Sequence, residues 1–405
     1  MQQLSFKFDR DKAFVILILI GLSSGSSFYV LTEILKPSHV LPIVATCFFP
    51  ITLAIKCLIY ERLMLFLLLY ILVALIYNTL LLGKDQLIDI YYIISLLHVY
   101  MAAKISADAL QESRKTFSVY PFLAFAIILL PYLYELATGS VINKGSTNVP
   151  CSIFNNPNDL ASYILIFIPC ALFCLDYLNC RKIVKFSFLS LVSFWILLLG
   201  SRTCFLILPI LIIGRLIFLG NFIRLFLTIN LVYFTGLYSS QMNWSEILRG
   251  FTYSNNELIS RTASRLFLFL FQSNSDNSLS YRLENYSYAL NNFHHAVIGS
   301  GTKNYGDFYQ AGFGNDPLLA ISPHSFLIEN AIAFGWIGIL LITIILGYMC
   351  FIFLKSKRYR YQGLSSAFIF MLVSNVPSSI IRLPILFFPM FFFFHLCLYD
   401  NQTKS

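Results

Sequence analysis

Charged residues are scarce in this sequence. Asp, Glu, Lys and Arg make up only 12% of its 405 residues, whereas 58% are hydrophobic and the mean hydropathy is +0.74. Soluble globular chains carry about 25% charged residues, because their helices need a polar face toward water. The deficit excludes a soluble domain built around a large core. It indicates an integral membrane protein instead.

The cysteines lack the spacing of a disulfide framework or a metal site. Most of the nine lie in or beside apolar runs, and only Cys151 falls in a long polar connection. This placement is typical of small packing residues. The first apolar stretch lacks a small-residue cleavage site, so we expect a retained helix and not a removable signal peptide.

Apolar runs long enough to cross a bilayer, which takes about 20 helical residues, recur along the chain. They predict an all-α polytopic membrane bundle of about twelve spans. The predicted spans lie near residues 14–32, 41–58, 63–83, 88–103, 118–138, 159–179, 186–200, 203–219, 222–239, 325–350, 364–380 and 383–399. The division between the seventh and eighth of these rests on one short polar break, Ser201-Arg202-Thr203.

The distribution of Lys and Arg predicts the orientation of the spans. Basic residues crowd every second connection, and the short connections on the other side hold few: Lys36, Lys84, Lys144, Arg202 and Arg382. Because cytoplasmic loops are the basic ones, we expect both termini in the cytoplasm. The net charge of +9 therefore reflects topology, and no nucleic-acid partner is expected.

Three regions follow from this topology. Residues 1–239 are expected to hold the first nine transmembrane helices, and residues 240–322 a large periplasmic loop. Residues 323–405 are expected to hold the last three transmembrane helices and a cytoplasmic tail. Within the loop, apolar residues at offsets of three and four predict an amphipathic helix over 278–296, which Gly299-Ser300-Gly301 ends.

A shorter outside connection, about residues 139–158, contains an Asn-Pro turn signal. The span that follows it needs a residue whose side chain accepts a hydrogen bond from the first free backbone N–H groups. We expect Asn158 or Asp159 to cap this helix.

Three ionisable residues lie at the predicted outer ends of spans, where such residues are functional candidates. Arg202 sits in a tight turn; contact with lipid headgroups is the simpler explanation, but the positive-inside bias disfavours an Arg there. Arg282 lies near the start of the loop helix, where a solvated surface residue is the commoner case for a lone arginine. His324 precedes a span that Ser325 can help to cap, and a histidine in this position is usually structural.

Four short patterns resemble those of one family. His324-Ser325, nine residues and then Gly335-Trp336-Ile337-Gly338 resembles the signature of the O-antigen ligase and O-antigen polymerase superfamily; the two glycines also let another helix approach closely. Gly200-Ser201-Arg202-Thr203 resembles the family's Ser-Arg turn. Arg282, a helix and Gly299-Ser300-Gly301 resemble its loop pattern. Asn156-Pro157-Asn158-Asp159-Leu160-Ala161 is a string often seen before a middle span in such proteins.

The resemblance implies a membrane glycosyltransferase fold that transfers a glycan from undecaprenyl diphosphate to an acceptor hydroxyl at the outer face. It implies an inverting reaction that needs neither a metal ion nor a cofactor. Arg202 and Arg282 are our candidates for binding the diphosphate and stabilising its departure, because guanidinium holds phosphate oxygens at two points and stays charged. His324 is our candidate for activating the acceptor, with a hydrogen bond to the diphosphate as its alternative role.

Further basic residues of the outer side can extend this site. Arg261, Arg265, Lys303 and Arg382 are candidates for binding the diphosphate or an acidic glycan. Contact with lipid headgroups explains them equally well. The tyrosines of the loop can stack on sugars, although tyrosine is also enriched at membrane interfaces.

Three functions remain open. We favour a polymerase that joins lipid-linked repeat units of a surface polysaccharide, because the Asn-Pro-Asn-Asp string is more typical of polymerases. An O-antigen ligase uses the same donor but transfers the glycan to lipid A-core. A flippase for lipid-linked oligosaccharide is less expected, because transporters carry charged residues along a central pathway in many spans, and these spans are nearly free of charge.

The expected partners are an undecaprenyl diphosphate-linked oligosaccharide, an acceptor glycan and the lipid bilayer. A chain-length regulator is a further candidate partner. The expected location is the bacterial inner (cytoplasmic) membrane, as a multi-pass protein with its active site on the periplasmic side.

Overall fold

The structure is a computed structural model. It describes residues 9–23, 37–76, 87–112, 115–138, 154, 156–199, 201, 204, 207, 209, 243–255, 259–260, 263–264, 266–267, 271, 277–292, 299, 324–377 and 379–402. Within these ranges every regular element is a helix, and no strand occurs. The all-α class predicted from the sequence is therefore confirmed for this part of the chain.

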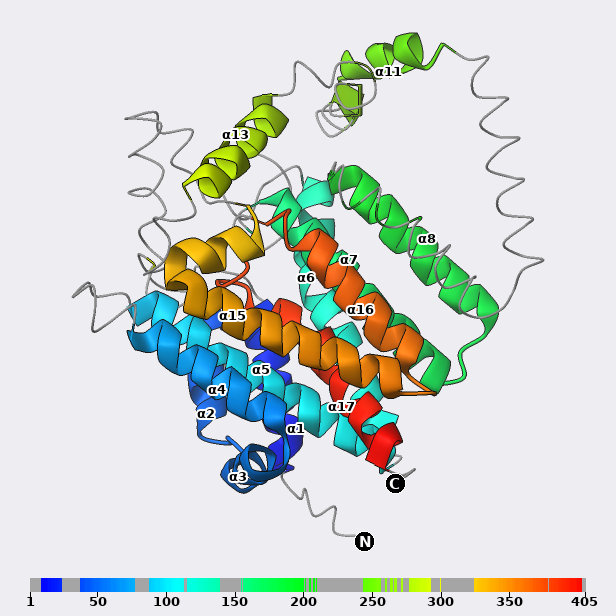
Figure 1. Cartoon of the computed structure of the whole chain (residues 1–405). Coiled ribbons are helices and arrows are strands. Elements are labelled where there is room, and N and C mark those ends of the chain that lie inside the picture. Colours follow the sequence, from blue (N-terminus) through cyan, green and yellow to red (C-terminus); the bar gives the residue numbers. More distant parts are fainter. Residues whose placement is uncertain are drawn as a thin grey trace, which may run out of the picture.

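The helices of the first half lie in the bundle shown in Figure 1. They are α1 (Arg10–Ser23), α2 (Pro37–Thr46), α3 (Ile51–Tyr60), α4 (Arg62–Leu75), α5 (Leu87–Gln111), the 3-10 turn η2 (Lys115–Val119), α6 (Tyr120–Thr138), α7 (Pro157–Tyr177) and α8 (Lys182–Leu199). The helices of the second half are α11 (Trp244–Thr252), α13 (Asn277–Asn291), α15 (Phe326–Lys355), α16 (Arg360–Val373), η5 (Pro384–Phe387) and α17 (Phe388–Gln402).

Among the described residues, four helices are long and apolar enough to cross a membrane. They are Tyr91–Gln111, Pro157–Tyr177, Phe326–Lys355 and Pro384–Gln402. A fifth span results if α2 and α3 are counted together. The prediction of about twelve spans is thus not confirmed. Most of the predicted spans 203–219 and 222–239, and most of the predicted loop 240–322, lie outside the described residues.

The segment predicted as one span near 41–58 is bent. The helices α2 and α3 meet at 82°, with Pro50 at the start of α3. Proline supplies no backbone N–H, and it pushes the preceding residue, Phe49, out of the helical region. The sequence pattern of apolar residues continues across this break, which is why hydropathy alone predicted a single straight helix.

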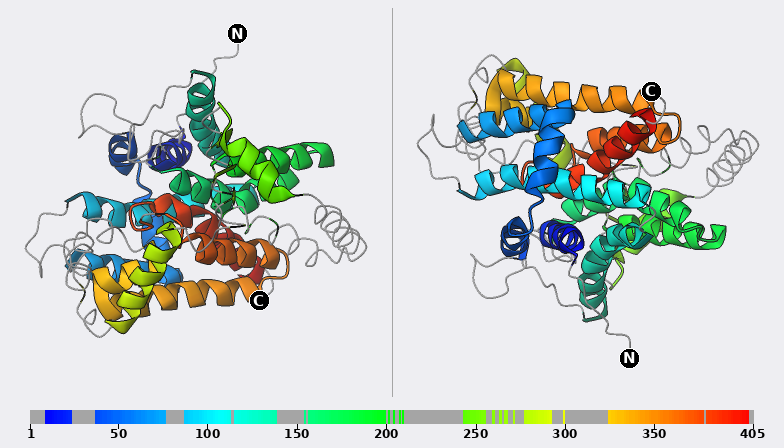
Figure 2. Two further views of the ribbon diagram at one scale, coloured as in Figure 1. Left: turned by 90° about the horizontal axis from the view of Figure 1, so that it is seen from above. Right: turned by 90° about the horizontal axis from the view of Figure 1, so that it is seen from below.

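The centre of the bundle is built on α17. This helix buries every residue from Phe388 to Cys397, and a helix that is apolar all round belongs in an interior. It packs along α5, while α15 packs against α4 and α16, and α1 packs against α2, α5 and α6 (Figures 1 and 2). The aromatic run of α17 thus fixes the positions of α5, α15 and α16.

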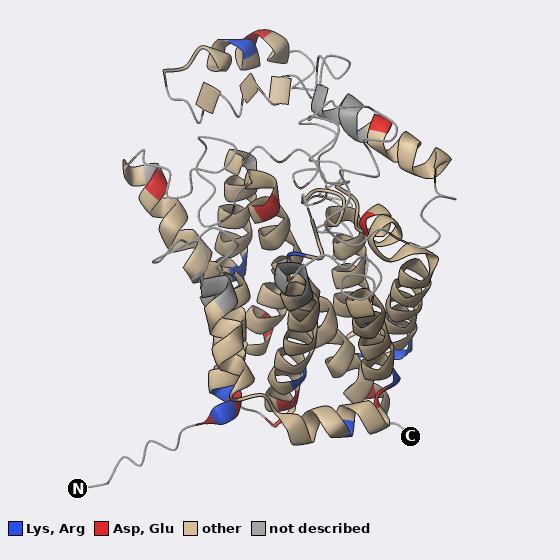
Figure 3. Cartoon of the chain, turned by 90° about the vertical axis from the view of Figure 1, so that its left-hand side faces the viewer, with Lys and Arg blue, Asp and Glu red and all other residues tan. Residues whose placement is uncertain are grey.

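Large apolar side chains cover the outside of the same bundle. Leu72 of α4, Phe186 of α8 and Leu340 of α15 are 53%, 69% and 60% exposed. Most Lys and Arg positions of the described residues lie toward the end of the bundle where α1 begins and α17 ends (Figure 3). An apolar belt with basic residues at one end is the surface expected of a membrane protein.

The start of α7 corrects one sequence prediction. The capping residue is Asn156, whose side chain accepts a hydrogen bond of 2.9 Å from the backbone N–H of Asn158. Asn158 and Asp159 were expected to cap, and they instead lie inside the first turn. Pro157 explains the shift, because proline is favoured at the first helical position, where its missing N–H costs nothing.

Candidate functional site

His324 lies immediately before α15 and is half-buried. Its backbone has φ +49°, a left-handed conformation that is uncommon for residues other than glycine. Its Nδ1 lies 3.1 Å from the carbonyl oxygen of Pro377. A carbonyl oxygen only accepts hydrogen bonds, so in the neutral ring Nδ1 carries the proton and Nε2 carries the lone pair. This contact therefore selects the tautomer in which Nε2 can act as a base.

Pro377 belongs to the α16–η5 connection, which comprises residues 374–377 and 379–383. The beginning of α15 holds this connection at two further points. The backbone N–H of Phe326 donates to the carbonyl of Ser374 at 3.2 Å. The carboxylate of Glu329 accepts from the hydroxyl of Ser379 and from the backbone N–H of Ile380 at 2.9 Å.

Glu329 is a polar residue of this region that the sequence reading missed. Its exposed fraction is 2%, and apart from its neighbour Asn330 the first three turns of α15 are apolar. A lone acidic residue inside an apolar span is costly unless it is hydrogen-bonded, so its presence was a usable signal.

The loop helix α13 contacts the same place. The hydroxyl of Tyr286 donates to the backbone carbonyl of His324 at 2.9 Å. Figures 1 and 2 show α13 lying over the first turns of α15. Arg282 lies one turn before Tyr286, on the same face of α13. The helix that carries Arg282 therefore contacts His324 through Tyr286. The side chain of Arg282 is not among the described groups.

The two glycine patterns predicted as separate parts of the site touch each other. Gly299 has φ +75°, and a Cβ added to it would lie 2.7 Å from the backbone N of Gly335. Gly335 has φ 63° and ψ −158°, a combination that only glycine adopts readily, and it breaks α15 into two parts. Backbone therefore packs on backbone at the break.

This arrangement corrects the prediction that Gly335 and Gly338 admit a neighbouring helix. The segment that reaches Gly335 is the chain at Gly299, which is not helical. At Gly338 an added Cβ would lie 2.4 Å from the Cβ of Phe334, in the same helix. The break at Gly335 folds Phe334 over Gly338, and this explains why a residue without a side chain stands there.

Of the remaining candidates, the structure describes Arg382. It is exposed and lies in the α16–η5 connection, where its backbone N–H donates to the hydroxyl oxygen of Ser379 at 3.3 Å. It thus shares a short connection with Pro377, the partner of His324. The other four candidates lie outside the described residues: Arg202, Arg261, Arg265 and Lys303.

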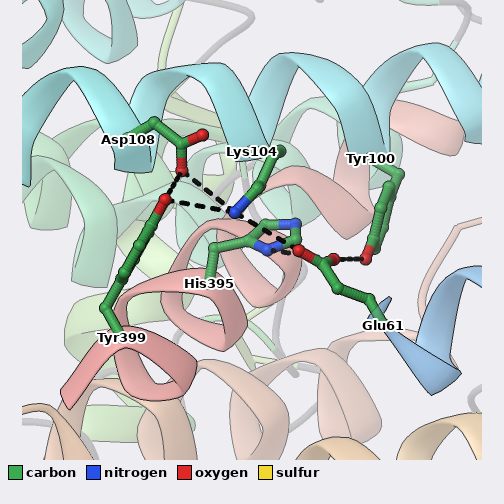
Figure 4. Close-up of polar contacts among 6 residues, drawn as sticks. All are labelled: Glu61, Tyr100, Lys104, Asp108, His395 and Tyr399. Carbon is green, nitrogen blue, oxygen red and sulfur yellow. Dashed lines mark hydrogen bonds and ion pairs between the residues drawn. The ribbon is translucent and has the colours of Figure 1, made fainter. Parts of the chain in front are cut away.

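A second polar cluster is formed by six residues, Glu61, Tyr100, Lys104, Asp108, His395 and Tyr399 (Figure 4). The Nζ of Lys104 is 3.2 Å from Glu61 and 3.1 Å from Asp108. The hydroxyl of Tyr399 donates to Asp108, and that of Tyr100 donates to Glu61. Lys104 lies buried within α5, although the span predicted near 88–103 ends just before it.

The neighbours of this second cluster show where it stands. Asp400, next to Tyr399 in α17, accepts hydrogen bonds of 2.8 Å from Ser356 and from the backbone N–H of Lys357, directly after the end of α15. His324 precedes the start of α15. The two clusters therefore lie at opposite ends of this helix. Among the residues described, no three His, Cys, Asp or Glu side chains form a group that could hold a metal ion.

The comparison with protein families adds an independent finding. A family model described as O-antigen ligase matches residues 162–343. The matched range begins in α7 and ends in α15, and it includes Arg202, Arg282, His324 and the break at Gly335. No curated protein matches the chain. Three of the four patterns that suggested the family lie in the matched region, and the string Asn156–Ala161 ends just before it. The match therefore supports the resemblance of this region to the O-antigen ligase and polymerase superfamily.

Proposed function

We propose that this protein polymerises a surface polysaccharide. It transfers a glycan from undecaprenyl diphosphate to a hydroxyl of another lipid-linked repeat unit, at the periplasmic face of the inner membrane. The observation that carries the proposal is the contact between His324 and Pro377, which leaves Nε2 as the basic nitrogen of the ring beneath the helix of Arg282. The match to the O-antigen ligase family model favours glycan transfer over transport.

The proposed reaction is a single displacement. The acceptor oxygen attacks the anomeric carbon from the side opposite the diphosphate, so that the configuration inverts. The bond between this carbon and the bridging oxygen breaks, and its electron pair leaves on the diphosphate. Nε2 of His324 takes the proton of the acceptor hydroxyl. No metal ion takes part in the proposed reaction.

The arginines account for the leaving group. Negative charge grows on the diphosphate as the bond breaks, and Arg202 and Arg282 stabilise that charge with two-point hydrogen bonds. Arg382, exposed on the connection that holds His324, is a further group that binds the donor. Arg261, Arg265 and Lys303 complete the proposed basic surface for the diphosphate or an acidic glycan.

A ligase is the second candidate, because the matching family model is described as O-antigen ligase. A ligase uses the same donor and the same displacement, and it differs in the acceptor, which is a sugar of lipid A-core. In both cases Arg202 and Arg282 act on the donor and His324 acts on the acceptor hydroxyl. The two functions therefore share one proposed site, and the glycan product that each forms distinguishes them.

Deletion of the gene separates the candidates. Loss of a polymerase leaves a single repeat unit on the core in a gel of surface glycans. Loss of a ligase leaves bare core, with polymer still on its lipid carrier. We expect the first pattern, and the second would replace the polymerase proposal with the ligase. Loss of a flippase leaves unpolymerised units facing the cytoplasm, and that pattern would overturn both.

Alanine variants test the site in the deletion strain. Arg202→Ala, Arg282→Ala and His324→Ala are each expected to lower transfer by about 100-fold or more while the protein still inserts, because each removes a group that acts on the transition state. Arg249→Ala on α11 is the control, since this arginine stands on another helix of the loop region. Wild-type glycan from all three site variants would remove the assignment.

A further inference from the structure

The carboxylate of Glu329 is fully engaged although it carries no proposed chemistry. One oxygen, Oε1, accepts from the hydroxyl of Ser379. The other, Oε2, accepts from the backbone N–H of Ile380 at 2.9 Å and faces that of Ile381 at 3.5 Å. A buried carboxylate costs free energy unless several donors surround it, and hydrogen bonds to an ionised acceptor are the strong ones. The α16–η5 connection supplies all of these donors.

The same connection carries the partner of His324. Pro377, whose carbonyl meets Nδ1, lies two residues before Ser379. His324 lies just before α15 and Glu329 lies in its first turn, five residues later. The connection is therefore fastened to α15 on both sides of the contact that orients the imidazole. If the hydrogen bonds of Glu329 to Ser379 and Ile380 are lost, the Pro377 carbonyl can move away from Nδ1 of His324.

Ser379 extends this arrangement toward Arg382. Its hydroxyl donates to Glu329, and its oxygen accepts from the backbone N–H of Arg382 at 3.3 Å. A serine hydroxyl can serve as donor and acceptor at once. The carboxylate thus fixes the backbone on the Pro377 side and on the Arg382 side of the connection.

We propose that Glu329 is a positioning residue of the transfer site, whose carboxylate holds the α16–η5 connection in the register that orients His324. This inference rests on the proposed role of His324. Glu329 does not touch the substrate and moves no proton. Its effect is confined to the placement of groups that do, and a misplacement of about 1 Å at a reacting group can cost about 100-fold in rate.

The test uses purified full-length protein and an assay of glycan transfer from a lipid diphosphate donor. Glu329→Gln keeps the size of the side chain but leaves only one acceptor oxygen. It is expected to lower kcat about ten-fold and to change the KM for the donor less than two-fold. Glu329→Asp keeps the carboxylate and is expected to restore part of kcat. A variant with wild-type kcat, or one whose loss equals its loss of folded protein, overturns the proposal.

A matched control separates positioning from stability. Tyr70→Phe removes a buried hydrogen bond of 2.6 Å to Asn330, the neighbour of Glu329, without touching the α16–η5 connection. It is expected to lower the melting temperature about as much as Glu329→Gln, because a typical buried hydrogen bond contributes a similar amount, while transfer per folded molecule stays at the wild-type level. If Tyr70→Phe lowers kcat to the same degree, the effect of Glu329 is general destabilisation.

A double variant tests the route through Ser379. Ser379→Ala alone is expected to lower kcat, and the combination with Glu329→Gln is expected to be no worse than Glu329→Gln, since the two residues act as one unit. If the losses of kcat in the two single variants multiply in the double variant, Glu329 does not act through Ser379. His324→Ala is measured alongside: if it transfers like the wild type, the proposed function of the site fails, whereas an inactive His324→Ala with a fully active Glu329→Gln removes only the positioning role.

Discussion

At the residue scale, His324 is defined by partners that lie far from it in the sequence. Its ring meets Pro377, 53 residues later, and its carbonyl meets Tyr286, 38 residues earlier. The motif of His324 and two later glycines could be recognised from the sequence. The contacts that select the ring tautomer could not, because no local pattern links a histidine to a backbone carbonyl of another helix connection.

Tyr286→Phe tests the contact between α13 and His324. The change removes the hydroxyl that donates to the His324 carbonyl and leaves the ring in place. A single hydrogen bond of this kind contributes about 1 kcal/mol, so we expect transfer to fall several-fold with little effect on insertion. The control is Tyr253→Phe, because Tyr253 is 75% exposed beside α11. Equal activity of the two variants in a transfer assay would contradict a role for this contact.

At the scale of elements, the break in α15 at Gly335 brings Gly299 into contact with the helix that His324 precedes. Gly335 and Gly338 were predicted to admit a helix. Their roles are instead to interrupt the helix and to make room for Phe334. Hydropathy predicted one continuous span here, because the apolar pattern does not stop at Gly335. Backbone dihedral angles decide this feature, and the sequence marks them only by the presence of glycine.

Gly335→Ala tests the break. An alanine at φ 63° and ψ −158° is strained by about 1–3 kcal/mol, and the contact with Gly299 leaves little space for relief. We expect a lower melting temperature and a large loss of transfer. Gly347→Ala in the same helix is the control, since nothing lies within 4 Å of its added Cβ. That change is expected to be neutral or stabilising by about 0.5–1 kcal/mol, because alanine favours helices over glycine.

The melting temperature of Gly335→Ala is measured by thermal unfolding in detergent, and its activity is measured as glycan transfer per folded molecule. A Gly335→Ala protein with wild-type stability and activity would show that α15 can continue through this position as an ordinary helix. A comparable loss in Gly347→Ala would show that any added methyl group in α15 is harmful.

At the scale of the whole molecule, polar groups gather at the two ends of an apolar bundle. One end holds His324, Glu329 and the α16–η5 connection, and the other holds the cluster of Lys104, Glu61 and Asp108. Composition alone predicted the membrane class and the helical fold. It could not predict the second cluster, because Lys104 lies near the end of a predicted span and reads equally well as a basic loop residue.

Lys104→Met tests whether this cluster stabilises the bundle. The change leaves the carboxylates of Glu61 and Asp108 without their shared cation, and breaking a buried pair typically costs about 3–5 kcal/mol. We expect a marked fall in unfolding temperature, with transfer reduced only in proportion to the folded protein. Lys12→Met is the control: its pair with Asp9 is 40% and 31% exposed, and such surface pairs contribute about 0–1 kcal/mol.

Stability equal to that of the wild type in Lys104→Met would contradict a structural role for the cluster. Loss of transfer without loss of folded protein would instead connect this end of the bundle with the reaction. Neither result is expected, because the cluster and His324 lie at opposite ends of α15.

The most direct measurement of the central claim is glycan transfer by the purified protein. The protein is mixed in detergent or in liposomes with an undecaprenyl diphosphate-linked glycan, and the lipid-linked products and the released undecaprenyl diphosphate are quantified. We expect longer glycans on the lipid carrier from the wild type, and none from folded His324→Ala. Transfer by His324→Ala at the wild-type rate, or no transfer by folded wild-type protein to either a lipid-linked or a lipid A-core acceptor, would contradict the proposed function.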